Sequence, residues 1–445
     1  MLSNNEFHVL VIGEVFTDVY LDVEIENKAI VRLGGVFHSA RSLKAINANY
    51  SLAFISPSYI LDSVNTYANK LGAIKCKCVG TIENAPNVML IKESTEACAQ
   101  GYSDLLRDQS KSKLDLSLLR ELIGEINPTD IIVYPGKYNF EEIAGILNSK
   151  KYRIHLDIQY AKSLSEIKIG FKAQTFIMSS SNEIFKHFVN NDYDDLIFEL
   201  QELTESILLK ENRGGARFFN FTDKNWTISP AFLTSTVHSV GVGDCFNSVF
   251  ITLLFEKLTI YTALKLSSYV ASQYASTFSF EIFLNNVYDI RNMDSIKEYR
   301  ASFLPWTERT KTEIYIAGPD FPYLDTSVFE KLEECLEYHN FSPHRPIQEN
   351  GLASEAKSST ERLGMFMKDV ELLEKSEVVI AVIINDDPGT YTEIGWAAKA
   401  NKPIILFDPF HRATNLFLTN SVKYICFTLN EVIDTLFIVV SKEDN

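Results

Sequence analysis

The sequence lacks the features that define several classes of protein. It has only six cysteines in 445 residues, and no second pair accompanies Cys76 and Cys78, so neither a disulfide framework nor a zinc site is indicated. No basic block interrupts an acidic balance of 42 Lys and Arg against 58 Asp and Glu, a net charge of −16. We therefore expect no nucleic-acid surface and no anionic membrane surface.

Long apolar runs and low-complexity segments are missing too. No stretch reaches the ~18 apolar residues of a membrane span. The apolar start of the chain carries His8 and Glu14 and leads into a strand pattern rather than a cleavage site. The sequence therefore predicts no membrane segment and no signal peptide, and we expect a cytoplasmic protein with reduced thiols and no metal site.

Short β-rich segments alternate with helical patterns along the whole chain, which is typical of α/β proteins with largely parallel sheets. The alternation fades over the polar residues 285–311 and resumes at 313. We predict a domain at 1–300, a linker at 301–311 and a second domain at 312–445. The expected first-domain strands are 8–13, 131–134, 154–158 and 175–178, with a hairpin at 216–221 and 226–228. In the second domain we expect strands 313–317, 378–384, 403–407 and 423–427, and helices near 327–339, 360–375 and 390–400, with one more at the C-terminus.

Two glycine-bearing segments of the first domain precede helical patterns. Gly34 and Gly35 would let a ligand approach the backbone, beside the free N–H groups of the following helix. In Gly241-Val-Gly243-Asp244 the amides could face developing negative charge while Asp244 takes a proton from an attacking hydroxyl. Either segment alone could be only a turn before a helix, and Asp244 alone only a helix N-cap.

In this order and spacing, the two segments resemble the signatures of the ribokinase/PfkB-like carbohydrate kinases. The resemblance covers about residues 7–300 and implies a ribokinase-like α/β fold that uses ATP and Mg²⁺. It implies that Asp18, Gly34 and Gly35 bind the sugar and that Asp244 is the catalytic base. The residues that it implies for the cofactor are Asn182, Lys210, Gly214, Gly215, Gly241 and Gly243, with Asp157 as the family's central Asp.

Three positions depart from this family's pattern. His238-Ser239 stands where Asp-Thr is usual, Ser39 stands where Asn is usual, and Phe185 replaces the Glu of an Asn-x-x-Glu motif. Because phosphoryl transfer depends on positioned metal and charge, such losses could cost several orders of magnitude in rate. Two hypotheses stay open: an active kinase, or a degenerate domain that binds a nucleotide or nucleoside as a sensor.

The second domain carries its candidate residues where strands end. Strand 313–317 runs into Gly318-Pro319-Asp320, and strand 378–384 runs into Asp387-Pro-Gly389-Thr390 and a helix that carries Glu393. In a doubly wound sheet both loops lie at the carboxyl edge, where ligands collect. We expect Glu393 to project into this crevice from the first turn of its helix and to stay ionised there, as a nucleophile should.

These segments look like the motifs of the nucleoside 2-deoxyribosyltransferase family. The matching motifs are Ile314–Phe321, Asp369 ahead of LLEKSEVVIAV, and Asp387-Pro-Gly-Thr-Tyr-Thr-Glu393-Ile-Gly395-Trp-Ala397. The resemblance spans about residues 312–410 and implies a doubly wound, flavodoxin- or Rossmann-like domain that acts on N-glycosidic bonds without a cofactor.

The same resemblance implies a role for each matching residue. Glu393 would attack the anomeric carbon and Tyr315 would orient it. Asp387 would hydrogen-bond or protonate the nucleobase, and Asp369 would hold the sugar hydroxyls. The further substrate-binding residues are Gly318, Pro319, Asp320, Gly389 and Thr390.

Structural interpretations of these residues stay open beside the functional ones. The segment from Asp387 to Thr390 could be only a turn and a helix start. Asp369 could simply be solvated on its helix. His344 and Arg345 could contact a substrate phosphate or lie in a solvated loop.

Three hypotheses about function follow. The main one is a fusion enzyme for a nucleoside, nucleotide or related N-ribosyl compound, in which the kinase-like half may phosphorylate substrate or product. The second is a regulated effector whose first domain senses a ligand or a regulatory protein partner while the second hydrolyses a nucleotide such as NAD. The third is a binding module with both sites inactive. The second resemblance also implies a homo-oligomer, because such families commonly complete their sites across subunits.

Overall fold

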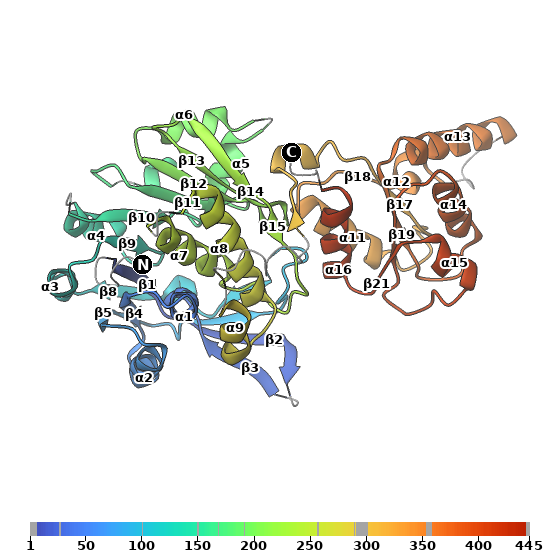
Figure 1. Cartoon of the computed structure of the whole chain (residues 1–445). Coiled ribbons are helices and arrows are strands. Elements are labelled where there is room, and N and C mark those ends of the chain that lie inside the picture. The colour runs from blue at the N-terminus through green and yellow to red at the C-terminus, as the bar shows by residue number, and fades with distance from the viewer. Residues whose placement is uncertain are drawn as a thin grey trace. The chain divides into compact units, whose positions relative to one another are not determined.

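A computed structural model describes residues 7–25, 28–99, 101–148, 151–167, 169–190, 192–255, 258–288, 290, 301–352 and 358–441. The chain forms two compact units (Figure 1): Met1–Thr95 with Gln100–Ala301, and Glu96–Ala99 with Ser302–Asn445. The stretch expected as a linker includes helix α10 (Trp306–Arg309), whose Arg309 is completely buried. Residues 291–300, on which the predicted boundary also depends, lie outside the described residues.

The first unit is built on a ten-stranded sheet in the order β14-β13-β12-β11-β10-β9-β1-β4-β5-β8. Neighbours from β12 to β5 run parallel, and β8, β13 and β14 are antiparallel additions, of which β13 and β14 form the predicted hairpin. The strands are β1 (Val9–Glu14), β4 (Tyr50–Ser56), β5 (Cys76–Glu83), β8 (Lys111–Leu114), β9 (Asp130–Val133), β10 (Arg153–Asp157), β11 (Thr175–Ser179), β12 (Ser206–Lys210), β13 (Ala216–Asn220) and β14 (Asn225–Ser229).

Helices cover both faces of this sheet (Figure 1). Every residue of β1 is buried, as expected of a parallel strand covered on both sides. One face shares a core with α1 (Val36–Ala45), α2 (Leu61–Leu71), α7 (Val242–Leu254), α8 (Ile260–Ala275) and α9 (Phe280–Val287), and α3 (Leu116–Ile126) and α4 (Phe140–Leu147) pack on the other. The short helices α5 (Glu183–Phe188) and α6 (Asp194–Leu200) follow β11.

A second, four-stranded sheet lies beside the carboxyl edge of the first, since β2 follows β1 directly along the chain. Its order is β3-β2-β6-β7, with β2 (Thr17–Ile25), β3 (Lys28–Leu33), β6 (Val88–Ile91) and β7 (Tyr102–Asp104). Tyr20 and Ile91 of this small sheet pack against Val240, just before α7. The small sheet therefore reaches the segment that carries the second glycine motif.

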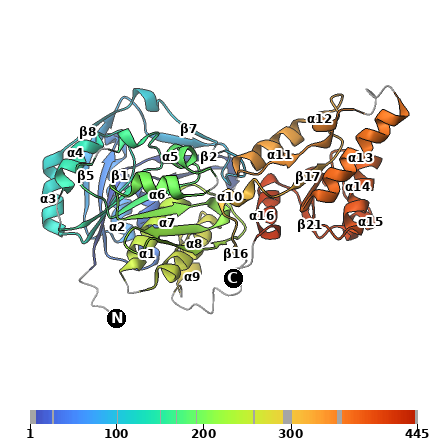
Figure 2. The ribbon, with the colours of Figure 1, turned by 90° about the horizontal axis from the view of Figure 1, so that it is seen from above.

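The second unit has a five-stranded, all-parallel sheet in the order β18-β17-β19-β20-β21. Its strands are β17 (Ile314–Ala317), β18 (Pro343–His344), β19 (Val378–Val382), β20 (Ile404–Phe407) and β21 (Tyr424–Cys426). Helices α11 (Ser327–Tyr338) and α16 (Leu429–Val439) lie on one side of the sheet, and α13 (Ser359–Lys375), α14 (Pro388–Lys399) and α15 (Leu416–Ser421) on the other (Figures 1 and 2). This arrangement confirms the doubly wound prediction.

The expectation that all cysteines are reduced is wrong for one pair. Cys98 and Cys335 of the second unit form a disulfide, whereas Cys76, Cys78, Cys245 and Cys426 are free. The two bonded residues are 237 positions apart, so tertiary structure alone brings them together and no local spacing signals the pair. None of the helices in the described ranges has the length and apolar character that a bilayer crossing requires.

Candidate functional sites

In the second unit, the ends of β17 and β19 bring Tyr315 and Glu393 together. Side chains alternate along β17, so Ile314 and Ile316 face α11 while Tyr315 points toward α14. Tyr315 is completely buried, and its hydroxyl donates a 2.6 Å hydrogen bond to Oε1 of Glu393. The two residues are 78 positions apart, and the predicted contact between them is present.

The protonation state of Glu393 differs from the expectation. Helix α14 begins at Pro388, so Glu393 lies in its second turn, where the helix N-terminus has little influence on charge. The pKa of Glu393 is raised to about 7, mainly by burial and also by the charges of Asp369 and Asp387, while the Tyr315 hydrogen bond opposes the shift. Glu393 is therefore partly protonated near neutral pH, and the prediction that its helix position keeps it ionised is wrong.

Asp369 lies on α13, and its carboxylate is held rather than freely solvated. Its Oδ1 accepts a 2.7 Å hydrogen bond from Nδ2 of Asn350, the last residue of α12 (Pro346–Asn350). Burial raises the pKa of Asp369, and the nearby charge of Glu349 adds to this shift. Sequence reasoning missed Asn350, because nothing in its local sequence distinguishes it from a helix-end residue.

Asp387 is the N-cap of α14, as its structural interpretation predicted. Its Oδ2 accepts hydrogen bonds from the backbone N–H of Thr390 at 2.6 Å and from the Thr390 hydroxyl at 2.7 Å. A Cβ atom at Gly389 would lie 3.0 Å from the same oxygen. Oδ1 of Asp387 accepts no hydrogen bond from the described residues, so the cap leaves one carboxylate oxygen for a ligand.

Other residues of this unit that were predicted to contact the substrate instead contact side chains of the protein itself. Asp320 is buried and forms a two-point ion pair with Arg345, at 2.9 Å to Nε and 2.8 Å to Nη2. Arg345 also pairs with Glu333, so its guanidinium is occupied on both sides. A Cβ atom at Gly318 would lie 2.5 Å from the Phe329 ring, which explains the need for glycine there. Pro319 lies in the same loop.

His344 is likewise engaged inside the unit. Its Nε2 lies 2.8 Å from Glu313 and its Nδ1 lies 3.0 Å from Glu349. Neither His344 nor Arg345 is therefore free to hold a substrate phosphate in the described arrangement.

In the first unit, a polar cluster lies where β10 and β12 end and α7 begins. Lys210 donates a 2.8 Å hydrogen bond to Oδ1 of Asn247, and Nδ2 of Asn247 donates one of 2.9 Å to Asp157. A Cβ atom at Gly243 would lie 3.3 Å from Nζ of Lys210, so the lysine lies over the first turn of α7. Sequence reasoning missed Asn247, although its position three residues after Asp244 places both on one helix face.

Asp244 is in the first turn of α7, beside this cluster. Burial raises its pKa to about 8, and the negative charges of Asp157 and Asp18 add to the shift while Lys210 opposes it. Burial also lowers the pKa of Lys210 and raises that of Asp157. The cluster thus contains a protonatable carboxyl next to a lysine.

The remaining predicted cofactor residues have structural partners. Asn182 caps α5 by accepting from the Phe185 N–H, and its amide donates to Ile158, Gln159 and Ala161 carbonyls. Gly214 ends the 3₁₀ turn η4 (Asn212–Gly214), and Gly215 follows it with a φ of 112°. The described part of the chain contains no group of three His, Cys, Asp or Glu that could hold a metal.

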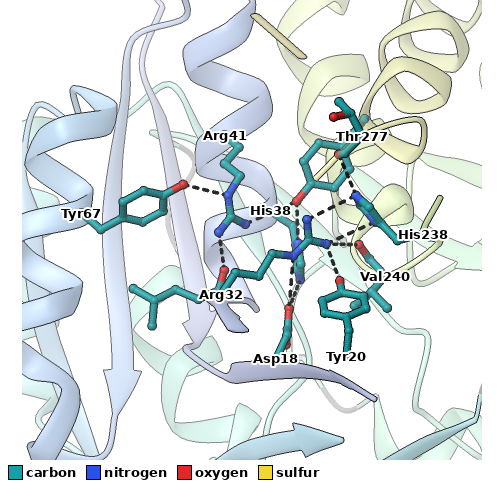
Figure 3. A network of polar contacts seen from close by, with 11 residues as sticks. Asp18, Tyr20, Arg32, His38, Arg41, Tyr67, His238, Val240 and Thr277 are labelled. Atoms are coloured by element: carbon teal, nitrogen blue, oxygen red, sulfur yellow. Dashed lines mark hydrogen bonds and ion pairs between the residues drawn. The ribbon is translucent and has the colours of Figure 1, made fainter. Parts of the chain in front are cut away.

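The amino acids predicted to bind the sugar are also in contact with other groups of the protein. A Cβ atom at Gly34 would lie 2.3 Å from either carboxylate oxygen of Asp18, and one at Gly35 would lie 2.1 Å from the Glu14 carbonyl oxygen. Oδ2 of Asp18 lies 3.2 Å from Nε2 of His38, within a larger polar network (Figure 3).

Comparison with known proteins supports the division of the chain into two units of different fold. Residues 314–425 match the family model for nucleoside 2-deoxyribosyltransferases. A ribokinase from Giardia lamblia is similar in structure, with a TM-score of 0.51 at 14% identity, over 65% of this chain and 99% of that one. A fructokinase from Xylella fastidiosa, solved with bound ATP, has a TM-score of 0.50 at 14% identity, with the same coverage. No curated protein sequence matches the chain. The chain thus joins a ribokinase-like N-terminal fold to a nucleoside 2-deoxyribosyltransferase-like C-terminal domain.

Proposed function

We propose that the second unit cleaves or transfers the N-glycosidic bond of a nucleoside, a nucleotide or a related N-ribosyl compound, with Glu393 as the nucleophile. The observation that carries this proposal is the 2.6 Å hydrogen bond from Tyr315 to Glu393. It lies at the carboxyl edge of a doubly wound sheet, within the segment that matches the family model.

The ionised form of Glu393 performs the first step. One carboxylate oxygen attacks the anomeric carbon, the bond from that carbon to the base nitrogen breaks, and its electron pair leaves with the base, which takes up a proton from water. Water or a second base then attacks the same carbon, loses a proton to the solvent and releases Glu393. Tyr315 keeps its proton, because burial and the charge of Glu393 raise its pKa, so it stays a donor that orients Oε1.

Asp387 and Asp369 bind the two ends of the substrate. Because Thr390 already donates twice to Oδ2 of Asp387, Oδ1 is the oxygen that would accept a hydrogen bond from an N–H group of the base. Asp369, oriented by Asn350, would accept hydrogen bonds from sugar hydroxyls. Both carboxylates also raise the pKa of Glu393. A substrate that binds to them would therefore alter the charge of the nucleophile.

For the first unit, we infer that it binds ATP, as does the similar fructokinase. The residues fit the phosphates, because Lys210 lies over Gly243 at the start of α7 and helix N-termini bind anions. Bound ATP, with Mg²⁺ on its phosphates, would supply the phosphoryl group of a kinase. Asp244 holds the position of the base that such a transfer requires, so transfer depends on an acceptor hydroxyl that can reach Asp244.

A covalent trap tests the role of Glu393. The full-length protein is incubated with 2′-deoxy-2′-fluoroarabinosyl nucleosides of adenine, hypoxanthine and thymine, whose fluorine slows both steps by destabilising the cationic transition state. We expect one equivalent of free base and a fluorosugar adduct on the peptide that contains Glu393. Glu393→Gln should give no adduct, and Glu371→Gln, on the exposed surface of α13, should label like the native protein. An adduct on another residue would contradict the proposal.

A further inference from the structure

Arg32 and six neighbouring residues form a cluster between the small sheet and the helices of the first unit, and Figure 3 labels Asp18, Tyr20, Arg32, His38 and His238 among them. Asp18, Tyr20, His38, His238 and Tyr274 are buried, with at most 3% of each residue exposed. The Arg32 cluster consists of Asp18, Tyr20 and Arg32 from β2 and β3, His38 from α1, His238 from the segment before α7, Tyr274 from α8, and Phe278 just after it. The cluster therefore joins five separate parts of the chain.

Arg32 is held by both polar and aromatic contacts. Its guanidinium lies 3.2 Å from each ring nitrogen of His238 and donates to the Val240 carbonyl at 3.2 Å and to the Tyr20 hydroxyl. It also lies between 5.1 and 5.5 Å from the ring centroids of Tyr20, Tyr274 and Phe278. Three aromatic faces around one cation fix its position and exclude water from it.

Side chains of the cluster fill the spaces that the glycines leave open. The Asp18 carboxylate occupies the space beside Gly34, where a Cβ atom would lie 2.3 Å from it. The His38 imidazole lies against Gly241, the N-cap of α7, where a Cβ atom would be 2.0 Å from Cγ of His38. Nδ1 of His38 is also 2.8 Å from the Tyr274 hydroxyl. Gly34 is thus buried beneath Asp18, and Gly241, which is partly exposed, has His38 packed on the side where a side chain would project.

The two sides of Asp244 consequently differ. Lys210, Gly241, Gly243 and Asp244 itself are all partly exposed, and Lys210 lies on the side that fits a phosphate. On the other side, the buried Asp18 carboxylate lies close enough to raise the pKa of Asp244, and the buried His38 ring packs against Gly241. An acceptor hydroxyl would have to reach Asp244 from this second side.

We propose that the Arg32 cluster permanently fills the space from which an acceptor would approach Asp244. It takes the place of a sugar or nucleoside and fastens the small sheet to α1, α7 and α8. The first unit therefore binds a nucleotide but does not transfer its phosphate to a sugar or nucleoside. This inference concerns the first unit alone and does not depend on Glu393 chemistry.

The test compares native and opened forms of the full-length protein. Each form is mixed with ATP, Mg²⁺ and one probe, namely D-ribose, D-fructose, myo-inositol or inosine. Mass spectrometry measures phosphorylated probe, and calorimetry measures probe binding. The opened variants are His38→Ala and the double variant Arg32→Ala with His38→Ala. The matched control is His155→Ala, which removes another buried histidine with two side-chain partners, Asp130 and Thr175, from β10 of the ten-stranded sheet.

The native protein and His155→Ala should neither phosphorylate nor bind any probe. An opened variant that keeps the native circular dichroism spectrum should bind at least one probe at least tenfold more tightly than the weakest binding that the calorimetry detects, whereas His155→Ala shows none. The proposal is overturned if the native protein forms a phosphorylated probe and Asp244→Asn loses that product. It is also overturned if folded opened variants bind no probe better than the control. Base release, measured in parallel, reports on Glu393 separately, so failure of one proposal does not imply failure of the other.

Discussion

Asp244 and Glu393 are two carboxyl groups in comparable positions of the two units. Each lies near the start of a helix at the carboxyl edge of a parallel sheet, and burial raises the pKa of both, to about 8 and about 7. Their neighbours differ: Glu393 is hydrogen-bonded to Tyr315 and lies near Asp387, whose Oδ1 accepts no hydrogen bond from the described residues, whereas His38 and Asp18 pack against Gly241 and Gly34. If the Arg32 cluster acts as we propose, a motif can place an acid without leaving room for the substrate that the acid would act on.

The largest expected effect is a difference between Glu393 and Asp244 in their importance for base release. Glu393→Gln should lower the rate of base release at least ~10³-fold, a loss of about 4 kcal/mol in transition-state stabilisation, because the amide cannot form the glycosyl intermediate. Asp244→Asn should leave base release within about twofold, since the glycosidic step uses no group of the first unit. Chromatography of free base from 2′-deoxynucleosides measures both. A comparable loss in Asp244→Asn would show that the two sites are coupled.

The next effect concerns stability rather than chemistry. Asp320→Ala should destabilise the second unit by about 3 kcal/mol, because it leaves the buried Arg345 guanidinium with Glu333 as its remaining partner. Thermal or urea unfolding measures the loss, and Glu371→Gln, in an exposed pair with Lys375, should change stability little. If Asp320→Ala instead kept full stability and lost substrate affinity, Asp320 would be a substrate contact after all.

A smaller effect has a defined pH dependence. The pKa of Asp244 is raised from 3.8 to about 8, so the folded state binds a proton that the unfolded state releases. This contribution to stability is fully present below pH 3.8 and is lost as pH rises through about 8. Asp244→Asn has no such loss, so its stability relative to the native protein should increase by roughly 2 kcal/mol between pH 6.5 and pH 8.5. Melting temperatures across this range measure it, and a constant difference would contradict the assigned pKa.

Most of the fold could be predicted from sequence, because buried parallel strands appear as short apolar runs. The predicted strand 131–134 corresponds to β9 (Asp130–Val133), and 403–407 corresponds to β20 (Ile404–Phe407). The contact of Tyr315 with Glu393 was implied only by the resemblance to nucleoside 2-deoxyribosyltransferases, because the two residues are 78 positions apart. The sequence therefore predicts well the features that a local strand or helix pattern determines.

Other features depend on contacts between distant segments, which no local pattern records. The hydrogen bond of Asn350 with Asp369, the Arg32 cluster and the disulfide of Cys98 with Cys335 are of this kind. The charge of Glu393 was mispredicted for a similar reason, because burial by tertiary packing decides its pKa and the helix N-terminus acts only over the first turn. Departures such as His238 were visible in the sequence, but their packing against Arg32 was not.

The smallest expected effect tests the hydrogen bond that distinguishes Glu393 from Asp244. Tyr315 donates to the ionised carboxylate and so lowers the pKa of Glu393, in opposition to burial. Tyr315→Phe keeps the ring but removes this donor, so the pKa of Glu393 should rise above about 7. At pH 7 base release should fall by roughly 10- to 30-fold, through less ionised nucleophile and poorer orientation. The pH profile of base release should also move to higher pH, so that the loss of rate becomes smaller above pH 8, which a purely structural defect would not produce.

The matched control is Tyr391→Phe, on the same helix as Glu393. It removes an exposed hydroxyl that is hydrogen-bonded to Asp386 and should leave the pH profile unchanged. A uniform loss at every pH would mean that Tyr315 positions Glu393 without tuning its charge.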